Sequence, residues 1–377
     1  MGASNHAFQR TAAKPTAVES NRCGRSKKII AIGWRILYFE HMSTRREPIV
    51  VSLYQIGKLD VLPEVQNSVV LANQTQQAFR FVFKNDAFPL PETLRLRNGG
   101  YDVESAVRSL IRRCRGRVGA PAFFITSQPY TDQASQEDPD GLFFSGLVVA
   151  EELGVISTHL WQKLPGARRI QPYILFCLSS IAFDICAGIS VHDETRGCPF
   201  DYCDKPSDID KAFDASGLCQ ECSRHMNRAL RTGRATIEQA GAAERLLNRA
   251  AGKKQAFVAM PFTPDMKSVF KTIRRTLQGH GWKVVRVDET AYPRSITDAV
   301  IHSILASNLV IADITGGNPN VFYELGWAHA TDQDVLLLTQ EEKIPFDVTT
   351  ERAIIYTLGT KGIARLMRQL LQAIKRD

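Results

Sequence analysis

The hydrophobic positions follow two different patterns along the chain. Before about residue 190, the short apolar runs IVVSLY, FRFVF, AFFIT and LFFSGLVVA predict strands, and the spacing in ESAVRSLIRRC predicts a helix among them. The long apolar segment IQPYILFCLSSIAFDICAGI predicts a buried helix, and QECSRHMNRALRT predicts another helix further along. The first pattern therefore indicates a mixed α and β domain.

After about residue 255, apolar runs alternate regularly with helical segments. The runs AFVAMPF, WKVVRVD, NLVIADIT and DVLLLTQ predict strands. The segments MKSVFKTIRRTLQGH, SITDAVIHSILAS and VFYELGWAHAT predict the helices between them. This alternation is typical of a parallel sheet with helices on both faces.

Composition divides the chain into four parts. Residues 1–48 are rich in Ser, Thr, Asn, Arg and Lys without periodicity, so we expect disorder or an extension upstream of the true start, for which Met42 is an alternative. One domain is expected over residues 49–232 and another over 255–377. Between them, residues 233–254 carry a narrow apolar stripe among alanines and charges, which predicts a linking helix that proteases can reach.

Charge and hydropathy narrow the class of protein. The formal charge is +8, but the basic residues are scattered and lack interleaved aromatics, so a nucleic-acid partner is not expected. The run IIAIGWRIL is too short for a membrane span and lacks the cleavage context of a signal peptide. We therefore expect a cytoplasmic protein without a membrane partner.

Four of the eight cysteines fall within one short stretch. Cys198 and Cys203 form one pair, and Cys219 and Cys222 form a second pair after fifteen intervening residues. In a chain without an export signal, this spacing favours metal ligation over disulfides. The pattern predicts a closed structural zinc site with four thiolates, and four unrelated buried cysteines are the alternative.

The segment AFDICAGISVH, followed by these cysteine pairs, resembles the archaemetzincin family of zinc peptidases. The resemblance implies a metzincin-like α+β fold and a four-cysteine zinc site. If His192 matches the last histidine of the family's zinc motif, Ala182, Phe183 and Cys186 stand where its other ligands and its base belong. Peptidase activity is therefore predicted to be absent. His192 is interpreted as an ordinary core or surface histidine, and binding of a second metal by His192 or Cys186 is the alternative.

The stretch NPNVFYELGWAHA places Glu324 near the start of an apolar helix, directly after a predicted strand. Ligands of parallel α/β sheets bind beyond the carboxyl ends of the strands, so this carboxylate is expected at the ligand crevice. With Asn320 as the cap, the helix dipole would keep a first-turn Glu324 ionised. Such a carboxylate can stabilise the oxocarbenium-like state of N-glycosidic cleavage, and a dipole-stabilising role without chemistry is the alternative.

The motifs AFVAMPF, VVRVDE, LVIADITGGNPNVFYELGWAHA and IPFDV together resemble the nucleoside 2-deoxyribosyltransferase-like group of bacterial TIR-like domains. The resemblance implies a flavodoxin-like α/β domain that cleaves N-glycosidic bonds, with Glu324 as the catalytic carboxylate. The residues expected to bind the substrate are Asp313, Asp288, Ala259, Met260, Pro261, Phe262, Asn320 and Tyr323.

Each assignment has a structural alternative. Asp313 could form a turn after its strand, and Pro261 could simply end one. Asn320 could be only a cap, and Tyr323 could pack in the core rather than stack on a base.

The leading interpretation is an NAD glycohydrolase acting as a regulated defence effector, with zinc as a structural cofactor and NAD as a substrate. A nucleoside deoxyribosyltransferase and a non-catalytic nucleotide sensor are the alternatives. Because TIR-like enzymes often complete their sites by assembly, the resemblance also implies a homo-oligomer on activation, by a signal that the sequence does not name.

Overall fold

The computed structural model describes residues 47–97, 99–102, 105–106, 108–109, 121–130, 146–150, 153–159, 170–189, 191–192, 196–201, 208, 211–213, 215, 217–289, 296–331, 333–345, 348 and 353–374. Pro48–Asp377 forms one compact unit, separate from Met1–Glu47. Residues 1–46 of the expected extension and most of the helix expected in ESAVRSLIRRC lie outside the described residues.

The first sheet has the strand order β2-β1-β3-β5-β4. All neighbours pair in parallel except β4, which is the antiparallel edge strand beside β5. The predicted run at the end of this set corresponds to β4, while β5 was not predicted separately. The strands are β1 (Ile49–Ile56), β2 (Phe79–Phe88), β3 (Ala122–Thr126), β4 (Gly146–Ala150) and β5 (Leu153–Ser157).

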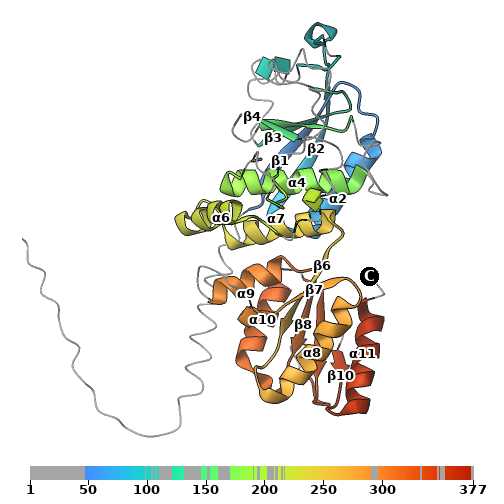
Figure 1. Cartoon of the computed structure of the whole chain (residues 1–377), viewed down its shortest axis with the longest axis vertical. Helices are drawn as coiled ribbons and strands as arrows, with labels where there is room; N and C mark the ends of the chain where they lie inside the picture. Colours follow the sequence, from blue (N-terminus) through green and yellow to red (C-terminus); the bar gives the residue numbers. More distant parts are fainter. Residues whose placement is uncertain are drawn as a thin grey trace, which may run out of the picture. The chain divides into compact units, whose positions relative to one another are not determined.

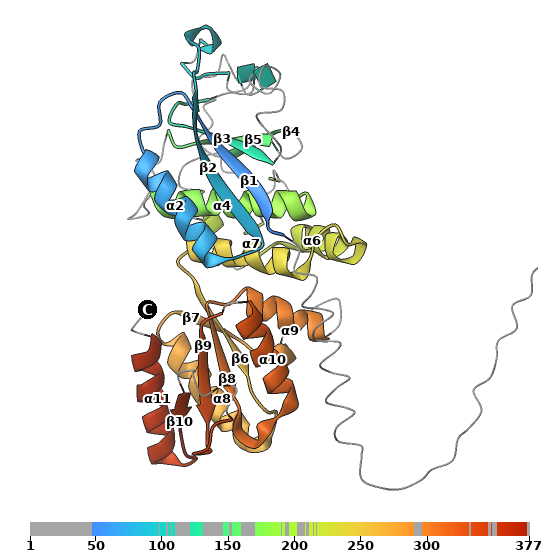
Figure 2. The ribbon, with the colours of Figure 1, turned by 180° about the vertical axis from the view of Figure 1, so that it is seen from behind.

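Helices cover one face of this sheet (Figures 1 and 2). Alternate strand residues such as Val51 and Leu53 share a core with the helices, while Tyr54 and Ile56 point into a second, aromatic cluster on the other face. This is the alternation expected of a strand with two buried sides. The helices are α2 (Leu62–Thr75), α4 (Ile170–Ala187), α6 (Gln220–Thr232) and α7 (Ile237–Ala250), and a 3-10 turn, η1, spans Glu92–Leu94.

Helix α4 is the predicted buried helix. It is long and apolar enough to cross a membrane by length and composition, yet 67% of it is buried inside the fold. Its side chains, including Ile174, Leu178 and Phe183, belong to the core shared with α2 and α7. These are the properties of a core helix, as the sequence predicts.

The second sheet is fully parallel, with the strand order β10-β9-β8-β6-β7. Numbered from its own first strand, this is the order 2-1-3-4-5 of flavodoxin-like folds, so the predicted fold class is confirmed. The short edge strand β10 was not predicted. The strands are β6 (Lys254–Ala259), β7 (Trp282–Val285), β8 (Leu309–Asp313), β9 (Val335–Thr339) and β10 (Ala353–Ile355).

Helices cover both faces of the second sheet (Figure 2). Alternate residues of β6 divide between the two cores: Val258 packs with α8 and α11, and Phe257 packs with α9 and α10. The predicted arrangement, with helices on both faces, is therefore present. The elements are α8 (Pro264–Gln278), η3 (Val287–Glu289), α9 (Ile296–Leu305), η4 (Thr315–Gly317), α10 (Pro319–Ala330) and α11 (Thr360–Ile374).

Helix α7 is the expected linking helix, but it is not thinly contacted. Eight of its residues are buried, and it packs against both α4 and α9. Gly241 lies so close to α9 that an added Cβ would come within 2.4 Å of the Leu305 Cβ. The buried Arg245 donates from Nε to the Leu305 carbonyl (2.5 Å) and from Nη1 to the Thr75 carbonyl (3.1 Å). The prediction that α7 buries only a narrow apolar stripe is therefore wrong, because α4 and α9 cover the helix on more than one side.

Candidate functional site

The strand order of the second sheet reverses between β6 and β8. From β6 the chain goes to β7 on one side, and then returns to β8 on the other side. In open parallel sheets, ligands bind beyond the carboxyl ends of the strands at such a switch point. Here Ala259 is the last residue of β6, Met260 follows it directly, and Asp313 is the last residue of β8.

Asp313 is fully buried, with 0% of its surface exposed, and both carboxylate oxygens accept hydrogen bonds. Oδ1 accepts from the backbone amide (3.1 Å) and hydroxyl (2.6 Å) of Thr315, and Oδ2 accepts from the hydroxyl of Tyr356 (2.6 Å). Burial raises the pKa of Asp313, and these hydrogen bonds partly oppose the rise. This geometry matches the alternative of a turn-forming aspartate, so direct contact with a substrate stays a prediction.

The hydrogen bonds around Asp313 close into a ring that joins the ends of three neighbouring strands. The side-chain amide of Gln340 donates to the Tyr356 hydroxyl (3.2 Å), and its backbone amide donates to the Thr315 hydroxyl (3.1 Å). Burial, followed by the charge of Asp313, raises the pKa of Tyr356, so the phenol stays a donor. Sequence reasoning missed Thr315, Gln340 and Tyr356, although each follows a strand directly or by one residue.

Glu324 lies on α10, which contacts β6 and β8. Two expectations about it are wrong. The helix is capped by Asn318, whose side chain accepts from the amide of Asn320 (2.9 Å), because Pro319 occupies the first helical position. Glu324 therefore lies in the second turn, and it is 9% exposed rather than a surface charge.

The environment of Glu324 is apolar. Its neighbours on the helix, Val321, Leu325 and Ala328, all belong to the core between α10 and the sheet. Burial raises the pKa of Glu324 to about 7, so the expectation of a fully ionised group near neutral pH is also wrong. Within the described part of the chain, the Glu324 carboxylate has no hydrogen-bond or ion-pair partner.

Arg286 connects two of the predicted residues. Its guanidinium donates to both carboxylate oxygens of Asp288 (2.7 Å each) and lies over the rings of Phe262 (5.1 Å) and Phe270 (3.9 Å). The hydrogen bonds from Arg286 lower the pKa of Asp288, so this carboxylate is ionised. Phe262 is 56% exposed, so its ring is held at the surface by the arginine. Sequence reasoning did not single out Arg286.

The remaining predicted residues are divided between core and surface. Ala259, Met260 and Pro261 are buried, whereas Asn320 is exposed and Tyr323 is half-buried against the core of α9 and α10. These positions make Ala259 to Phe262 a buried strand end that emerges at Phe262. The predicted residues therefore include one buried, unpartnered carboxylate, Glu324, and one buried, fully bonded carboxylate, Asp313.

A second candidate site lies in the first region, where His192, Cys198, Cys219 and Cys222 bring four ligand atoms within 4.8 Å of one another. The Sγ atoms of Cys198 and Cys222 are 3.8 Å apart, and the Sγ of Cys219 is 3.5 Å from Nε2 of His192. A tetrahedral zinc ion with ordinary Zn–S and Zn–N bonds separates two sulfurs by about 3.8 Å and a sulfur from a nitrogen by about 3.6 Å. The residues therefore fit a zinc ion.

His192 belongs to this cluster, which corrects its interpretation as an ordinary core or surface histidine. A parallel bridge pairs His192 with Asp201, and the His192 Nδ1 lies 3.3 Å from Oδ1 of Asp201. A carboxylate behind a histidine orients the ring toward a metal. Cys203, the fourth predicted ligand, lies outside the described residues.

The pKa values of the three cysteine thiols are shifted in different directions by their surroundings in the cluster. Burial raises the pKa of Cys198 and of Cys222. Burial acts the same way on Cys219, but hydrogen bonds, first from the Cys222 amide, lower the pKa of Cys219 to about 6. Cys219 precedes α6, where free amides favour a thiolate. A bound cation would draw the protons from the other two thiols.

Cys186, which the archaemetzincin resemblance places at a ligand position, lies apart from the cluster. Its thiol is buried and faces the Phe183 carbonyl at 3.7 Å, and burial raises the pKa of Cys186 to about 12. This is the environment of an inert core thiol.

No protein-family model and no curated protein matches the chain. The solved structures similar to it include an archaemetzincin from Methanopyrus kandleri, which is 16% identical over 50% of this chain and 98% of that chain, with a TM-score of 0.35. A zinc-dependent peptidase from Methanocorpusculum labreanum is 15% identical over 47% of this chain and 99% of that one, with a TM-score of 0.30.

A third similar structure is the CMP N-glycosidase of Clostridium botulinum, which is 23% identical over 32% of this chain and 99% of that chain, with a TM-score of 0.26. The neighbours thus include both an archaemetzincin and an N-glycosidase, while the TIR-like and deoxyribosyltransferase resemblances stay predictions. At such low TM-scores the likenesses carry no inference about activity, which must come from the site.

Proposed function

We propose that the part of the chain built on the second sheet is an N-glycosidase. It would break the bond between the base of a nucleoside or nucleotide and C1′ of the sugar. The observation that carries the proposal is the buried carboxylate of Glu324, which follows the switch-point strand β8 and has no partner in the described chain. Leaving a carboxylate in an apolar core without a partner costs stability. Such a cost is typical of groups kept for chemistry.

The proposed reaction places the negative charge where positive charge develops. As the C1′–N bond breaks, its electron pair leaves with the base, and C1′ becomes oxocarbenium-like. Ionised Glu324 stabilises that state, and its low-dielectric surroundings strengthen the interaction. Water then adds to C1′. With NAD, the electron pair of the broken bond makes the departing nicotinamide neutral, so the proton that the water loses goes to solvent; with a neutral nucleoside or nucleotide, that proton ends on the departing base. The products are the free base and the remaining sugar portion with a hydroxyl at C1′.

Other residues act as supports in this scheme. The ring of hydrogen bonds around Asp313 fixes the ends of β8, β9 and β10, so Asp313 is a positioning residue. Phe262, exposed and backed by Arg286, offers an aromatic face on which a base can stack.

NAD is the substrate that we propose first, with hydrolysis as the outcome and a regulated defence role. Transfer of the sugar to a second base, and binding of a nucleotide without cleavage, are the competing outcomes. The cysteine–histidine cluster is proposed to hold a structural zinc ion in a domain that controls the glycosidase.

The test is release of free base by the full chain from NAD, from cytidine monophosphate and from deoxynucleosides, each with and without an acceptor base. Glu324→Gln keeps the size of the side chain but removes the charge, so turnover should fall about a hundredfold, the scale of losing one preorganised electrostatic group. Glu342→Gln, at an exposed position, is the matched control and should retain activity. Wild-type turnover by Glu324→Gln would refute the catalytic role, and binding without base release would favour the sensor.

A further inference from the structure

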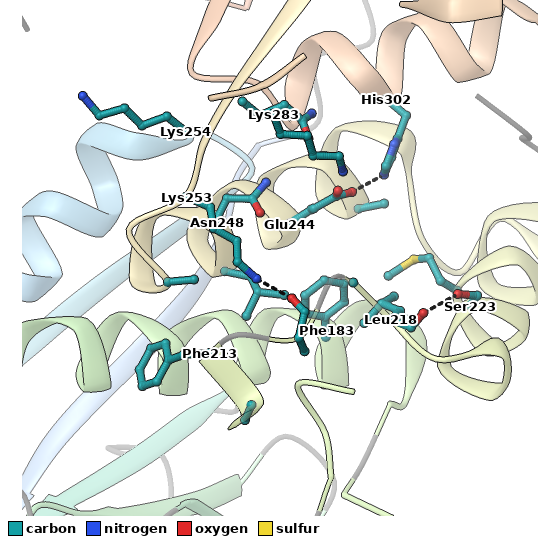
Figure 3. A pocket seen from close by; sticks show the side chains of 18 of the residues that line it. Phe183, Phe213, Leu218, Ser223, Glu244, Asn248, Lys253, Lys254, Lys283 and His302 are labelled. Atoms are coloured by element: carbon teal, nitrogen blue, oxygen red, sulfur yellow. Dashed lines mark hydrogen bonds and ion pairs between the residues drawn. The ribbon is translucent and has the colours of Figure 1, made fainter. Parts of the chain in front are cut away.

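A cavity of about 310 Å³ lies elsewhere in the compact unit, lined by neither Glu324 nor the residues of the Asp313 ring. Its walls come from α4, α6, α7, the starts of β6 and β7, and α9, together with the described residues Ala212, Phe213, Ala215, Gly217 and Leu218. Figure 3 shows the side chains that surround it. A volume of this size is at the lower end of what drug-sized ligands occupy, which is about 300–1,000 Å³.

One part of the cavity is apolar. Phe183 of α4, Phe213, Met226 of α6 and Leu247 of α7 are buried side chains that line it, and Leu218 lines it as well. Two aromatic rings with three aliphatic side chains form a surface suited to a flat, hydrophobic molecule.

The polar part of the cavity is mostly cationic. Among the described residues that line it, Lys253, Lys254 and Lys283 are basic and Glu244 is the one acidic side chain, which is paired with His302 (3.2 Å). Lys253 donates to the Ala215 carbonyl, and the Nζ of Lys254 lies over the Trp282 ring (5.4 Å). Figure 3 shows the Lys254 side chain extending away from the cavity, so the ammonium groups of Lys253 and Lys283 are counted against the one carboxylate of Glu244. The described lining therefore has more positive than negative charge, which favours an anion.

Lys283 differs from the other two lysines. It is exposed at the mouth of the cavity, and it has no hydrogen-bond or ion-pair partner within the described ranges. Figure 3 shows its side chain extending toward the pair of Glu244 and His302. Its ammonium group is therefore available to a ligand without breaking an existing contact.

We infer that this cavity binds a small organic anion with a flat apolar body, seated with its ring against Phe183 and Leu247 and its acid group at Lys283. The inference is independent of the proposed glycosidase, because the two sites share no residue. The fluorescent dye 8-anilinonaphthalene-1-sulfonate has this chemistry, and it serves as the probe.

The first experiment places the dye. Asn227 of α6 lines the cavity, whereas its neighbour Arg228 is exposed and does not. Asn227→Trp should fill the cavity and weaken dye binding to the full chain more than about tenfold, the loss expected when an apolar body is excluded from its pocket. Arg228→Trp should bind as wild type does. Equal binding by the two variants, at equal thermal stability, would overturn the inference.

The second experiment tests the charge. Lys283→Met should weaken binding of the sulfonate dye about threefold to fivefold, the range expected for losing one exposed charge contact. It should leave binding of the neutral analogue N-phenyl-1-naphthylamine unchanged. Lys267→Met, which removes an exposed charge from α8, should change neither dye. If Lys283→Met affects both dyes equally or affects neither, the anion is not held at Lys283 and the inference fails.

Discussion

The side chains of the cysteine–histidine cluster and of Glu324 are ionisable groups that are largely withdrawn from water. The two places differ in what compensates for the lost hydration. In the cluster, four ligand atoms face one another within 4.8 Å, and Asp201 lies behind the histidine. Glu324, in contrast, is surrounded by apolar side chains of α10 and has no partner among the described residues. The first arrangement suits an ion that stays, and the second suits a charge that is matched only while a substrate is present.

The largest effect should follow from opening the cluster. Cys219→Ser removes one of the four ligands. Structural zinc contributes about 10 kcal/mol or more to the folding of small zinc domains. The part of the chain built on the first sheet should therefore lose its cooperative unfolding transition. Elemental analysis should find about one zinc per chain in wild type, as a four-ligand site holds, and far less in the variant.

Cys186→Ala is the control for this experiment, because it removes a buried thiol that lies outside the cluster. It should retain the metal. A wild-type protein that is folded, stable and free of metal would contradict the zinc assignment.

The next effect concerns the dependence of turnover on pH. The proposed chemistry needs ionised Glu324, and its pKa is about 7. Turnover should therefore be constant above about pH 8 and fall about tenfold for each pH unit below the pKa, provided that this group controls the rate. The measurement is base release between pH 5 and 9 by wild type, with stability checked at each pH. A profile that is flat down to pH 5 would remove Glu324 from the rate-limiting step.

A smaller effect should appear in stability. The folded pKa of Glu324 is raised above its ordinary value of 4.5, so the folded state holds the proton more tightly than the unfolded state does. Stability should therefore fall as pH rises from about 4.5 to 7 and beyond, and the total loss should be about 3 kcal/mol.

Glu324→Gln should remove this dependence, so that the variant is more stable than wild type at pH 8 and similar to it at pH 4. Urea unfolding at the two pH values measures the difference, with Glu342→Gln as the control. A variant that is less stable than wild type at pH 8 would mean that the carboxylate has a partner after all.

The smallest effect should come from the bonded carboxylate. Tyr356→Phe removes one donor to buried Asp313 and should cost about 1–2 kcal/mol of unfolding free energy. Because Asp313 would lose a bond that favours its charged form, its pKa should rise further, and the cost should be larger at neutral pH than at pH 3. Thermal unfolding at both pH values tests this, and an equal cost at both would show that Asp313 is already neutral.

The local pattern of apolar and polar residues predicts the second sheet well, because each of its central strands is a continuous apolar run bounded by polar residues. It fails for β5 and β10, since β5 follows β4 with a gap of two residues and β10 has three residues. The helix cap was misplaced by two positions, although Pro319 indicates Asn318 as the cap. That small error moved Glu324 from a buried second turn to an exposed first turn, and changed its expected charge.

The cluster was predicted in part, because cysteine spacing is a local signal. The position of His192 in the cluster depends on a contact that the local sequence does not show. A bridge pairs it with Asp201, nine residues away, and cysteine spacing does not reveal that bridge. Ion pairs such as Arg286 with Asp288 are likewise set by packing, here against Phe262 and Phe270.

The close approach of α7 to α9 at Gly241 limits where the chain can be cut into fragments that fold. The carbonyls at the end of α9 are capped by α7, since Leu305 accepts from Arg245 and Ala306 accepts from Asn248 (3.5 Å). A fragment that begins at Gln255 would leave these carbonyls and the Leu305 side chain to solvent. One that begins at Thr236, the cap of α7, keeps them covered. Recombination between related genes should therefore preserve α7 together with the second sheet, and should tolerate only glycine at position 241.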